Sequence, residues 1–207
     1  MELFPSEYQQ LELNRHEKVF VRHALNCESE FGMLLLKVNP AMLPGESMHI
    51  VLVPKGIVLC KFLPLDNPLL FPVFAGAYVS GVYANTISIA KSKLESNLSL
   101  LDETHKLRVP FSSICIFPLL KRDDIDCAAL SKDLRYFVEN KCMFAEEFTN
   151  LRGNFLGSME SYLSTPEQIV SASPLELNEQ NANAVLQRLA PEYTTVRFAS
   201  LPDKETK

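Results

Sequence analysis

Several side chains that could do chemistry gather in the segment formed by residues 46–66. Glu46 and His49 lie at its start, Lys61 lies inside an apolar run, and Asp66 follows that run. The carboxylates offer the oxygen ligands that a hard cation such as Mg²⁺ prefers. His49 is a candidate base because histidine titrates near neutral pH, but a strand-end histidine that hydrogen bonds hold in place is the commoner case. An unpaired ammonium is costly in an apolar run, so we expect Lys61 to pair with Glu46 or with Glu17 upstream.

The spacing of histidines, cysteines, serines and glycines excludes several enzyme classes. The four histidines lack His-x-His and His-Glu-x-x-His spacing, and the five cysteines lack a Cys-x-x-Cys pair, so neither a zinc hydrolase nor a structural zinc site is predicted. No Gly-x-Ser-x-Gly motif is present, which argues against an α/β-hydrolase. No Gly-x-x-x-x-Gly-Lys-Ser/Thr loop is present either, so we expect no ATP binding by this chain.

The charge and hydropathy of the chain limit its partners. The formal net charge is −5, whereas a domain that holds nucleic acid by itself is usually basic, so DNA contact by this chain alone is disfavoured. One local group of cations remains a candidate nucleic-acid-binding patch: Lys91, Lys93, Lys106 and Arg108. No apolar run approaches the roughly 20 residues of a membrane-spanning helix, and no secretory signal is recognised. Widely spaced cysteines, odd in number, are typical of reduced thiols, so we expect a cytoplasmic protein without membrane partners.

The apolar periodicity predicts an α/β order of elements. Residues 15–25 have helical spacing, and residues 31–38 indicate a strand. Two β-branched runs joined by Pro54-Lys55-Gly56 predict a hairpin over residues 49–65, because proline presets φ and glycine accepts positive φ. Residues 66–83 have no clean period, so we expect an irregular loop or short strands. The later elements are predicted as a helix at 85–102, a buried strand at 109–118, and one or two helices at 127–160 interrupted near residue 153.

A stretch rich in serine and proline marks a domain boundary between about residues 165 and 174. We expect a main domain at 1–165 and a connector helix and tail at 166–207, with the helix over 177–189. The predicted fold class is α/β, with a mixed central sheet flanked by helices and an additional helical C-terminal part.

The order of the expected elements resembles that of the nuclease-related domain family. A helix bearing Glu17 comes first, then a hairpin that turns through Pro54-Lys55-Gly56-Ile57, then a further helix and a buried strand ending in Phe-Pro. The resemblance covers about residues 15–120 and implies a restriction-endonuclease-like fold. In that family, a helix glutamate, an aspartate in the first hairpin strand and the glutamate of a Glu-x-Lys in the second hold a divalent metal that activates water, and the lysine helps to position the nucleophile. The helix glutamate matches Glu17 in this chain.

The other catalytic positions of that family hold different residue types here. Aligned through the shared turn, the aspartate position falls on Met48, the glutamate position on Lys61 and the lysine position on Leu63. A thioether, an ammonium and an isobutyl group form no oxygen site for a hard cation. The resemblance therefore implies a degenerate domain with neither a cofactor nor nuclease activity.

Two carboxylates could replace the missing ligands. Glu46 lies two residues before the aspartate position, on the same face of an extended strand, and Asp66 follows the second strand. With Glu17 they would form a Mg²⁺ site of altered geometry, and an active Mg²⁺-dependent DNA nuclease is thus the first alternative. Glu17 itself lies among the cations of the 15–25 helix, where a solvated ion pair is its commoner role.

A second resemblance concerns the residues after 176. Leu177-Asn-Glu-Gln-Asn-Ala is similar to the glutamine motif of UvrD-type superfamily 1 helicases, although Asn181 stands at the glutamine position. Nuclease-related domains can precede such helicases. We therefore expect a catalytically inactive accessory or docking domain, the N-terminal part of a UvrD-type helicase in DNA processing or phage defence. Its partner would be the helicase core or another protein domain, with DNA reached through the parent protein. A stand-alone protein-interaction module is the second alternative.

Overall fold

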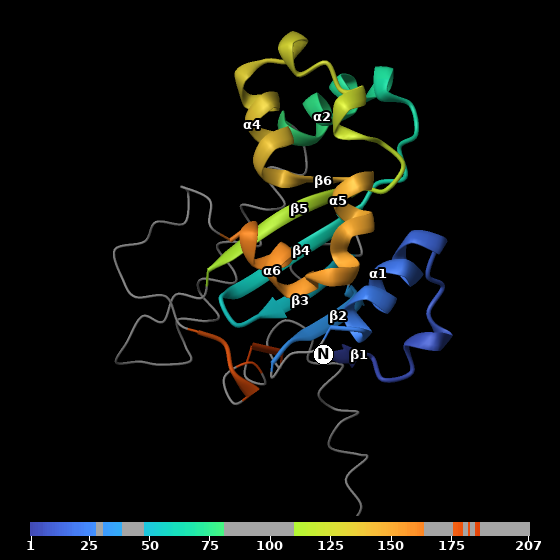
Figure 1. The fold of residues 1–207 in the computed structure, drawn as a ribbon, viewed down its shortest axis with the longest axis vertical. Helices are drawn as coiled ribbons and strands as arrows, with labels where there is room; N and C mark the ends of the chain where they lie inside the picture. Colours follow the sequence, from blue (N-terminus) through green and yellow to red (C-terminus); the bar gives the residue numbers. More distant parts are fainter. Residues whose placement is uncertain are drawn as a thin grey trace, which may run out of the picture.

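A six-stranded mixed sheet flanked by helices organises the protein in the computed structural model (Figure 1). The structure describes residues 1–27, 31–38, 48–80, 110–163, 176–179, 182, 185 and 186. Across the sheet the strands are β1 (Glu2–Phe4), β2 (Met33–Val38), β3 (Met48–Val53), β4 (Gly56–Phe62), β5 (Phe111–Phe117) and β6 (Cys142–Phe144). The described α-helices are α1 (Arg15–Leu25), α2 (Phe71–Ser80), α4 (Lys132–Lys141), α5 (Ala145–Asn150) and α6 (Phe155–Ser161).

The strands combine an antiparallel meander with parallel edges. β2, β3 and β4 are antiparallel to one another, whereas β1 runs parallel to β2, β5 to β4, and β6 to β5. The predicted strand, hairpin and buried strand are confirmed as β2, β3–β4 and β5. β1 and β6 were not predicted, because a strand of three residues is too short to show a period.

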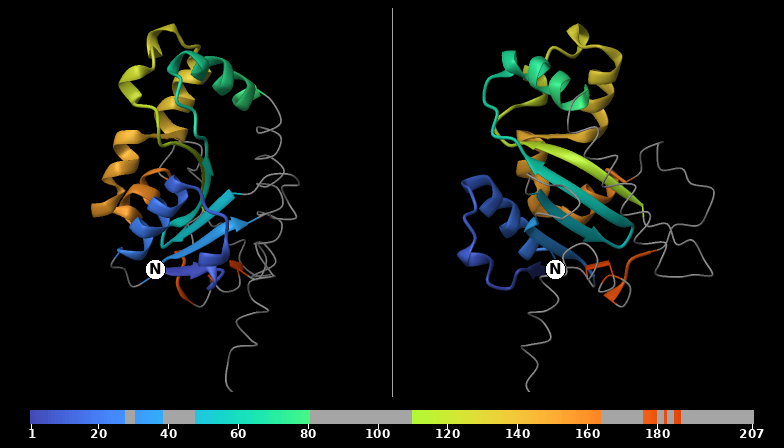
Figure 2. Two further views of the ribbon diagram at one scale, coloured as in Figure 1. Left: turned by 90° about the vertical axis from the view of Figure 1, so that its right-hand side faces the viewer. Right: turned by 180° about the vertical axis from the view of Figure 1, so that it is seen from behind.

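Helix α1 lies with α5 and α6 on one face of the sheet (Figure 2). The Asn14 side chain caps the helix, and the Glu17 side chain returns a hydrogen bond to the Asn14 N–H, which forms a capping box. This cap fixes the start of α1 at Arg15, so the predicted helix is confirmed at both ends. Its apolar side joins a core of strand and helix residues that includes Phe20, Val21, Ala24, Leu34, Val51, Cys60, Ile114 and Phe155.

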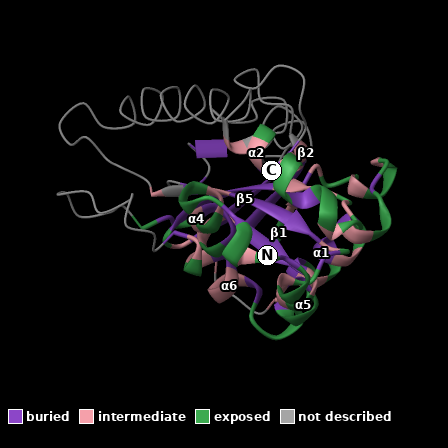
Figure 3. Cartoon of the chain, turned by 90° about the horizontal axis from the view of Figure 1, so that it is seen from above, coloured by how far each residue is buried: buried purple, intermediate pink, exposed green. Residues whose placement is uncertain are grey.

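Helices α2 and α4 cover the β5–β6 end of the opposite face. Phe71 of α2 packs edge-on against Phe117 of β5, with ring centroids 5.2 Å apart, inside a second apolar cluster. The expected irregular structure at residues 66–83 is wrong in part, since residues 68–70 form the 3₁₀ helix η2 (Pro68–Leu70) and α2 follows it directly. α2 escaped prediction because apolar residues surround the whole helix and leave no polar face to reveal the period. Figure 3 shows buried strands at the centre and exposed residues on the outer sides of the helices.

The predicted one or two helices at residues 127–160 are three short α-helices, preceded by the 3₁₀ helix η4 (Cys127–Ala129), so the predicted number is wrong. α4, α5 and α6 are separated by β6 and by the 3₁₀ helix η5 (Leu151–Gly153), so the expected interruption near residue 153 is confirmed. The four phenylalanines that recur along this region are all buried: Phe137, Phe144, Phe148 and Phe155. They belong to the core.

The hairpin turn between β3 and β4 meets three later parts of the chain. At Gly56, whose φ is +153°, a Cβ atom would lie 2.2 Å from the Pro110 carbonyl oxygen, so only glycine allows this approach. The Lys55 ammonium contacts the Glu160 carboxylate of α6 at 2.8 Å. The Leu177 N–H donates a hydrogen bond of 2.6 Å to the Pro54 carbonyl, and Leu177 is buried. The hairpin turn therefore holds part of the segment that was expected to be a connector.

Some predictions fall outside the described residues. These are the helix at 85–102, the tail, and most of the helix at 177–189, of which residues 179, 182, 185 and 186 are helical. Within the described ranges, none of the helices has the length and apolar character needed to cross a lipid bilayer.

Candidate functional site

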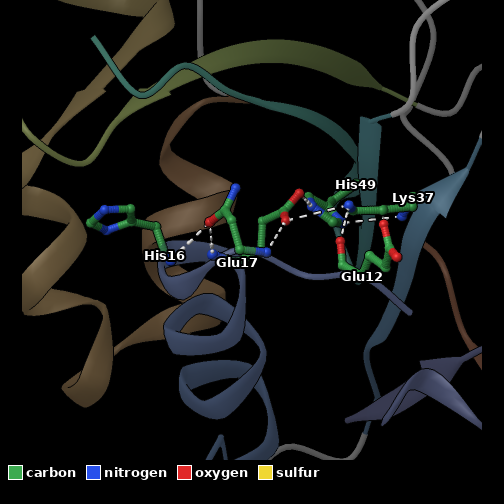
Figure 4. A network of polar contacts seen from close by, with 6 residues as sticks. Glu12, His16, Glu17, Lys37 and His49 are labelled. Carbon is green, nitrogen blue, oxygen red and sulfur yellow. Dashed lines mark hydrogen bonds and ion pairs between the residues drawn. The ribbon is translucent and has the colours of Figure 1, made fainter. Parts of the chain in front are cut away.

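A buried carboxylate from the first turn of α1 and a buried histidine of β3 meet inside the protein (Figure 4). The Nε2 atom of His49 lies 2.9 Å from Oε1 of Glu17, and both residues are buried, with exposed fractions of 2% and 8%. Glu17 occupies the inward side of the first turn of α1, and His49 stands in a strand whose other five residues are apolar. The hydrogen bond between Glu17 and His49 therefore joins α1 to β3 inside the core.

A β-bulge in β2 brings a third group to the pair. Leu35 pairs with Ile50, and Val38 pairs with Met48, so two residues of β2 stand opposite His49. The second of them, Lys37, has a φ of +45°, a left-handed conformation that costs a non-glycine residue about 1 kcal/mol. This conformation turns the Lys37 N–H toward Nδ1 of His49, at 3.2 Å.

The Lys37 side chain also reaches the carboxylate. Its ammonium nitrogen lies 3.7 Å from Oε2 of Glu17 and donates a hydrogen bond to the Glu12 carbonyl. About a third of the Lys37 side chain remains exposed, so this ion pair forms the solvent-facing edge of the cluster. We use the name Glu17 cluster for Asn14, Glu17, Lys37 and His49.

The hydrogen bonds of the Glu17 cluster fix the protonation pattern of His49. Because Nδ1 accepts a hydrogen bond from the Lys37 N–H, the ring proton of neutral His49 is on Nε2 and is donated to Glu17. Both ring nitrogens are then occupied by protein groups. His49 is a strand histidine held in place by hydrogen bonds, and no ring nitrogen is left to take a proton from a substrate.

Both carboxylate oxygens of Glu17 are occupied as well. Oε1 accepts from His49, and Oε2 accepts from the Asn14 N–H at 2.7 Å and faces the Lys37 ammonium. Burial by itself raises the pKa of the Glu17 carboxyl. The hydrogen bonds from His49 and Asn14 and the charge of Lys37 outweigh burial, so the pKa of Glu17 is held below its usual value. Glu17 is thus a stable carboxylate and not a proton donor at neutral pH.

Aromatic rings seal the inner side of the Glu17 cluster. The Phe62 ring meets the His49 ring edge-on, with centroids 5.4 Å apart, and Phe20 lies against both. Phe148 of α5 stacks beside Phe20 and closes the layer toward the outer helices. This apolar surround strengthens each polar contact in the cluster and raises the cost of leaving any of them unpaired.

The structure separates the residues that the family resemblance aligned at one metal site. His49 pairs with Cys60 across the hairpin and faces α1, so Met48 and Lys61, next along their strands, point to the opposite face of the sheet. Leu63 follows β4 and packs against the apolar cluster beneath α2 and α4. Glu17 therefore meets neither Met48, Lys61 nor Leu63.

Other predicted site residues have different outcomes. The partners of Glu17 are the members of its cluster, so the expected pairing with Lys61 is wrong for Glu17. The expectation that Glu17 is solvated is also wrong, because the residue is buried. Asp66 lies exposed beyond β4. Five predicted residues fall outside the described part of the chain: Glu46, Lys91, Lys93, Lys106 and Arg108.

The described residues do not fit a Mg²⁺ site. Among residues 1–27, 31–38, 48–80, 110–163 and the described positions after 175, no three carboxylate, histidine or cysteine side chains converge as a ligand set. Glu17 could ligate a cation only by giving up His49, Asn14 or Lys37.

Comparison with known protein families, with curated proteins and with solved structures found no match to this chain. The geometry of the described residues is therefore the basis for the functional proposal.

Proposed function

We propose that this chain is a non-catalytic, nuclease-like domain that serves as an accessory or docking module. The observation that carries the proposal is the closed Glu17 cluster. Glu17 is the one aligned family carboxylate that this chain retains, and each of its oxygens is bound by a protein donor inside the core. In this proposal the buried, hydrogen-bonded pair of Glu17 and His49 fills the place of a metal centre and joins α1 to the sheet.

The arrangement of elements supports the nuclease-like part of the proposal. A capped helix precedes an antiparallel hairpin, and the buried strand β5 follows later in the chain, in the order that the resemblance implies. The register of the hairpin differs from what a metal site of the family type would need. The α1 side of the hairpin carries His49, Cys60 and Phe62 in place of a carboxylate set, so an active site of the family type would need ligands from elsewhere in the chain.

Exposed apolar side chains support the docking part of the proposal. Leu69 and Val73 expose 83% and 74% of their surface, and Leu70 and Leu119 expose about half. Leu69 and Leu70 belong to η2 and Val73 to the first turn of α2, and neighbouring exposed apolar side chains of this kind are typical of protein contacts. The proposed partner is the core of a UvrD-type DNA helicase in the same polypeptide, with a separate protein partner as the alternative.

A cleavage assay tests the proposal against the active-nuclease alternative. The purified chain is incubated with supercoiled and linear DNA in Mg²⁺ and in Mn²⁺, beside Glu46→Ala and Glu17→Gln variants. We expect no cleavage under any condition, because Glu17 is not free to bind metal. Cleavage that Glu46→Ala abolishes would overturn the proposal and favour a nuclease with relocated ligands.

The helicase link has its own test. Sequencing the gene beyond codon 207 should show an open reading frame that leads into a Gly-x-x-x-x-Gly-Lys-Ser/Thr loop. A stop codon directly after codon 207 would contradict the link and favour the stand-alone interaction module.

A further inference from the structure

The outward side of α1 carries a row of cations. Arg15, Lys18 and Arg22 are exposed, whereas Glu17, the acidic residue of the helix, is turned inward and bound in its cluster. Arg152 of η5 is exposed beside them, since η5 packs against α1. Within the described ranges, none of these four side chains makes an ion pair. We call these four residues the basic face.

The spacing of the basic face matches a phosphate backbone. Residues three and four apart in an α-helix lie on one side, so Arg15, Lys18 and Arg22 fall within an arc of about 60°. At a rise of about 1.5 Å per residue, they cover roughly 10 Å along the helix axis. One strand of a duplex has a phosphate about every 3.4 Å along its axis, so the row spans about three phosphates.

The pKa of a histidine next to the basic face is lowered in part by the charges of that face. His23 lies half-buried on α1 and contacts the Phe148 ring edge-on. Burial lowers the pKa of His23, and the charges of Arg152 and Arg22 lower it further. Arg22 of α1 and Arg152 of η5 therefore act on the same spot, although they are 130 positions apart in the sequence.

We propose that the basic face binds the phosphate backbone of nucleic acid, without sequence preference. Exposed guanidinium groups pair with phosphate oxygens through two parallel hydrogen bonds, and such contacts carry no base information. This site consists of other residues than the cations at residues 91–108, and it is a local group of cations in a chain whose net charge of −5 by itself disfavours DNA contact. It is also independent of the proposed function, because phosphate binding needs neither a metal nor a catalytic residue.

The structure disfavours two other anionic partners. Insertion of α1 into a membrane would require its apolar side, but Phe20, Val21 and Ala24 are buried against the sheet. A tight protein interface usually centres on buried aromatic anchors, whereas the basic face adjoins one exposed large apolar residue, Leu25. A phosphate backbone needs only the cations.

Fluorescence anisotropy with a labelled duplex of mixed sequence tests the proposal, in EDTA so that cleavage plays no part. Four phosphate contacts predict that log K falls against log salt with a slope of about −3.6 between 50 and 200 mM NaCl. Removing two contacts in the variant Arg15→Gln/Arg22→Gln should halve this slope and weaken binding about 60-fold at 0.1 M salt, at about eightfold per contact.

The matched control removes the same charge from another helix. Lys132 and Arg135 are exposed on α4, and Lys132→Gln/Arg135→Gln should bind as tightly as the parent chain. Glutamine and arginine have similar helix propensities, so both variants should fold, as circular dichroism can verify. The pair Lys18→Gln/Arg152→Gln replaces the first variant if that one unfolds.

Several outcomes would overturn the proposal. They are no binding of duplex by the parent chain at 50 mM salt, equal loss of binding in the α4 control, and unchanged binding in both basic-face variants. Binding to phosphatidylserine vesicles that is as strong as binding to DNA would also overturn it, in favour of a membrane. DNA cleavage in Mg²⁺ would refute the non-catalytic function and leave the phosphate site intact.

Discussion

Replacing Glu17 by alanine should destabilise the protein by about 3 kcal/mol. The change leaves the buried His49 N–H without an acceptor, which costs about 1–3 kcal/mol, and removes one half of the capping box of α1, which costs about 0.5–1 kcal/mol. It also removes the partly exposed contact with Lys37, which is worth little.

Urea and thermal unfolding, followed by circular dichroism, measure this loss. For a chain of this size, about 3 kcal/mol lowers the Tm by roughly 6–12 °C. The control is Glu139→Ala, which removes an exposed glutamate of α4 and should change the free energy of unfolding by no more than about 0.5 kcal/mol. A double-mutant cycle with His49→Ala should give a coupling energy of about 1–3 kcal/mol. If Glu17→Ala unfolds within about 0.5 kcal/mol of the parent chain, the Glu17 cluster does not hold α1 on the sheet.

Three further predictions concern pH, backbone shape and thiol reactivity. Folding lowers the pKa of Glu17, so the contribution of its carboxylate to stability is complete above pH 4.5 and is lost as the pH falls toward the lowered pKa. The difference in unfolding free energy between the parent chain and Glu17→Gln should therefore shrink in that range. A constant difference would contradict this. Gly56→Ala should lower the free energy of unfolding in urea by more than about 1 kcal/mol, because the added Cβ meets the Pro110 carbonyl. Gly153→Ala should lower it by less, because a Cβ there meets no atom within 4 Å. Equal losses of stability would refute the close approach at Gly56. A thiol reagent should label two cysteines of the folded chain rapidly and the other three only on unfolding, since burial raises the pKa of the Cys60 and Cys142 thiols. The two reactive thiols are Cys27 and Cys127, and the three protected ones are Cys60, Cys115 and Cys142.

Local signals predicted the elements that have strong periods or turn chemistry. α1 begins and ends where its apolar spacing and the Asn14 cap require, and the Pro54-Lys55-Gly56 turn sets the hairpin. α2 was missed because its buried Phe71 and exposed Val73 are equally apolar, so no polar face reveals which residues point inward. β6 was missed because three residues between two helices carry no alternation.

The Glu17 cluster could not be predicted from alternation. Every residue of β3 is buried, so the sequence does not indicate whether His49 or Met48 faces α1. One signal was present, since a histidine inside an apolar strand requires a polar partner. The partner depends on the bulge at Lys37, and that bulge follows from the pairing of β2 with β3 and from no residue pattern within β2.

The bulge has a consequence for the way this chain tolerates changes in length. Lys37 is an extra residue in β2, so an in-frame deletion of its codon would give a shorter strand that pairs continuously with β3 and lacks a left-handed residue. The same deletion would remove the amide that binds His49 and the ammonium beside Glu17. Deleting this codon would therefore make the sheet more regular but would break the Glu17 cluster. The sequence retains Lys37, and with it the polar contacts of the cluster.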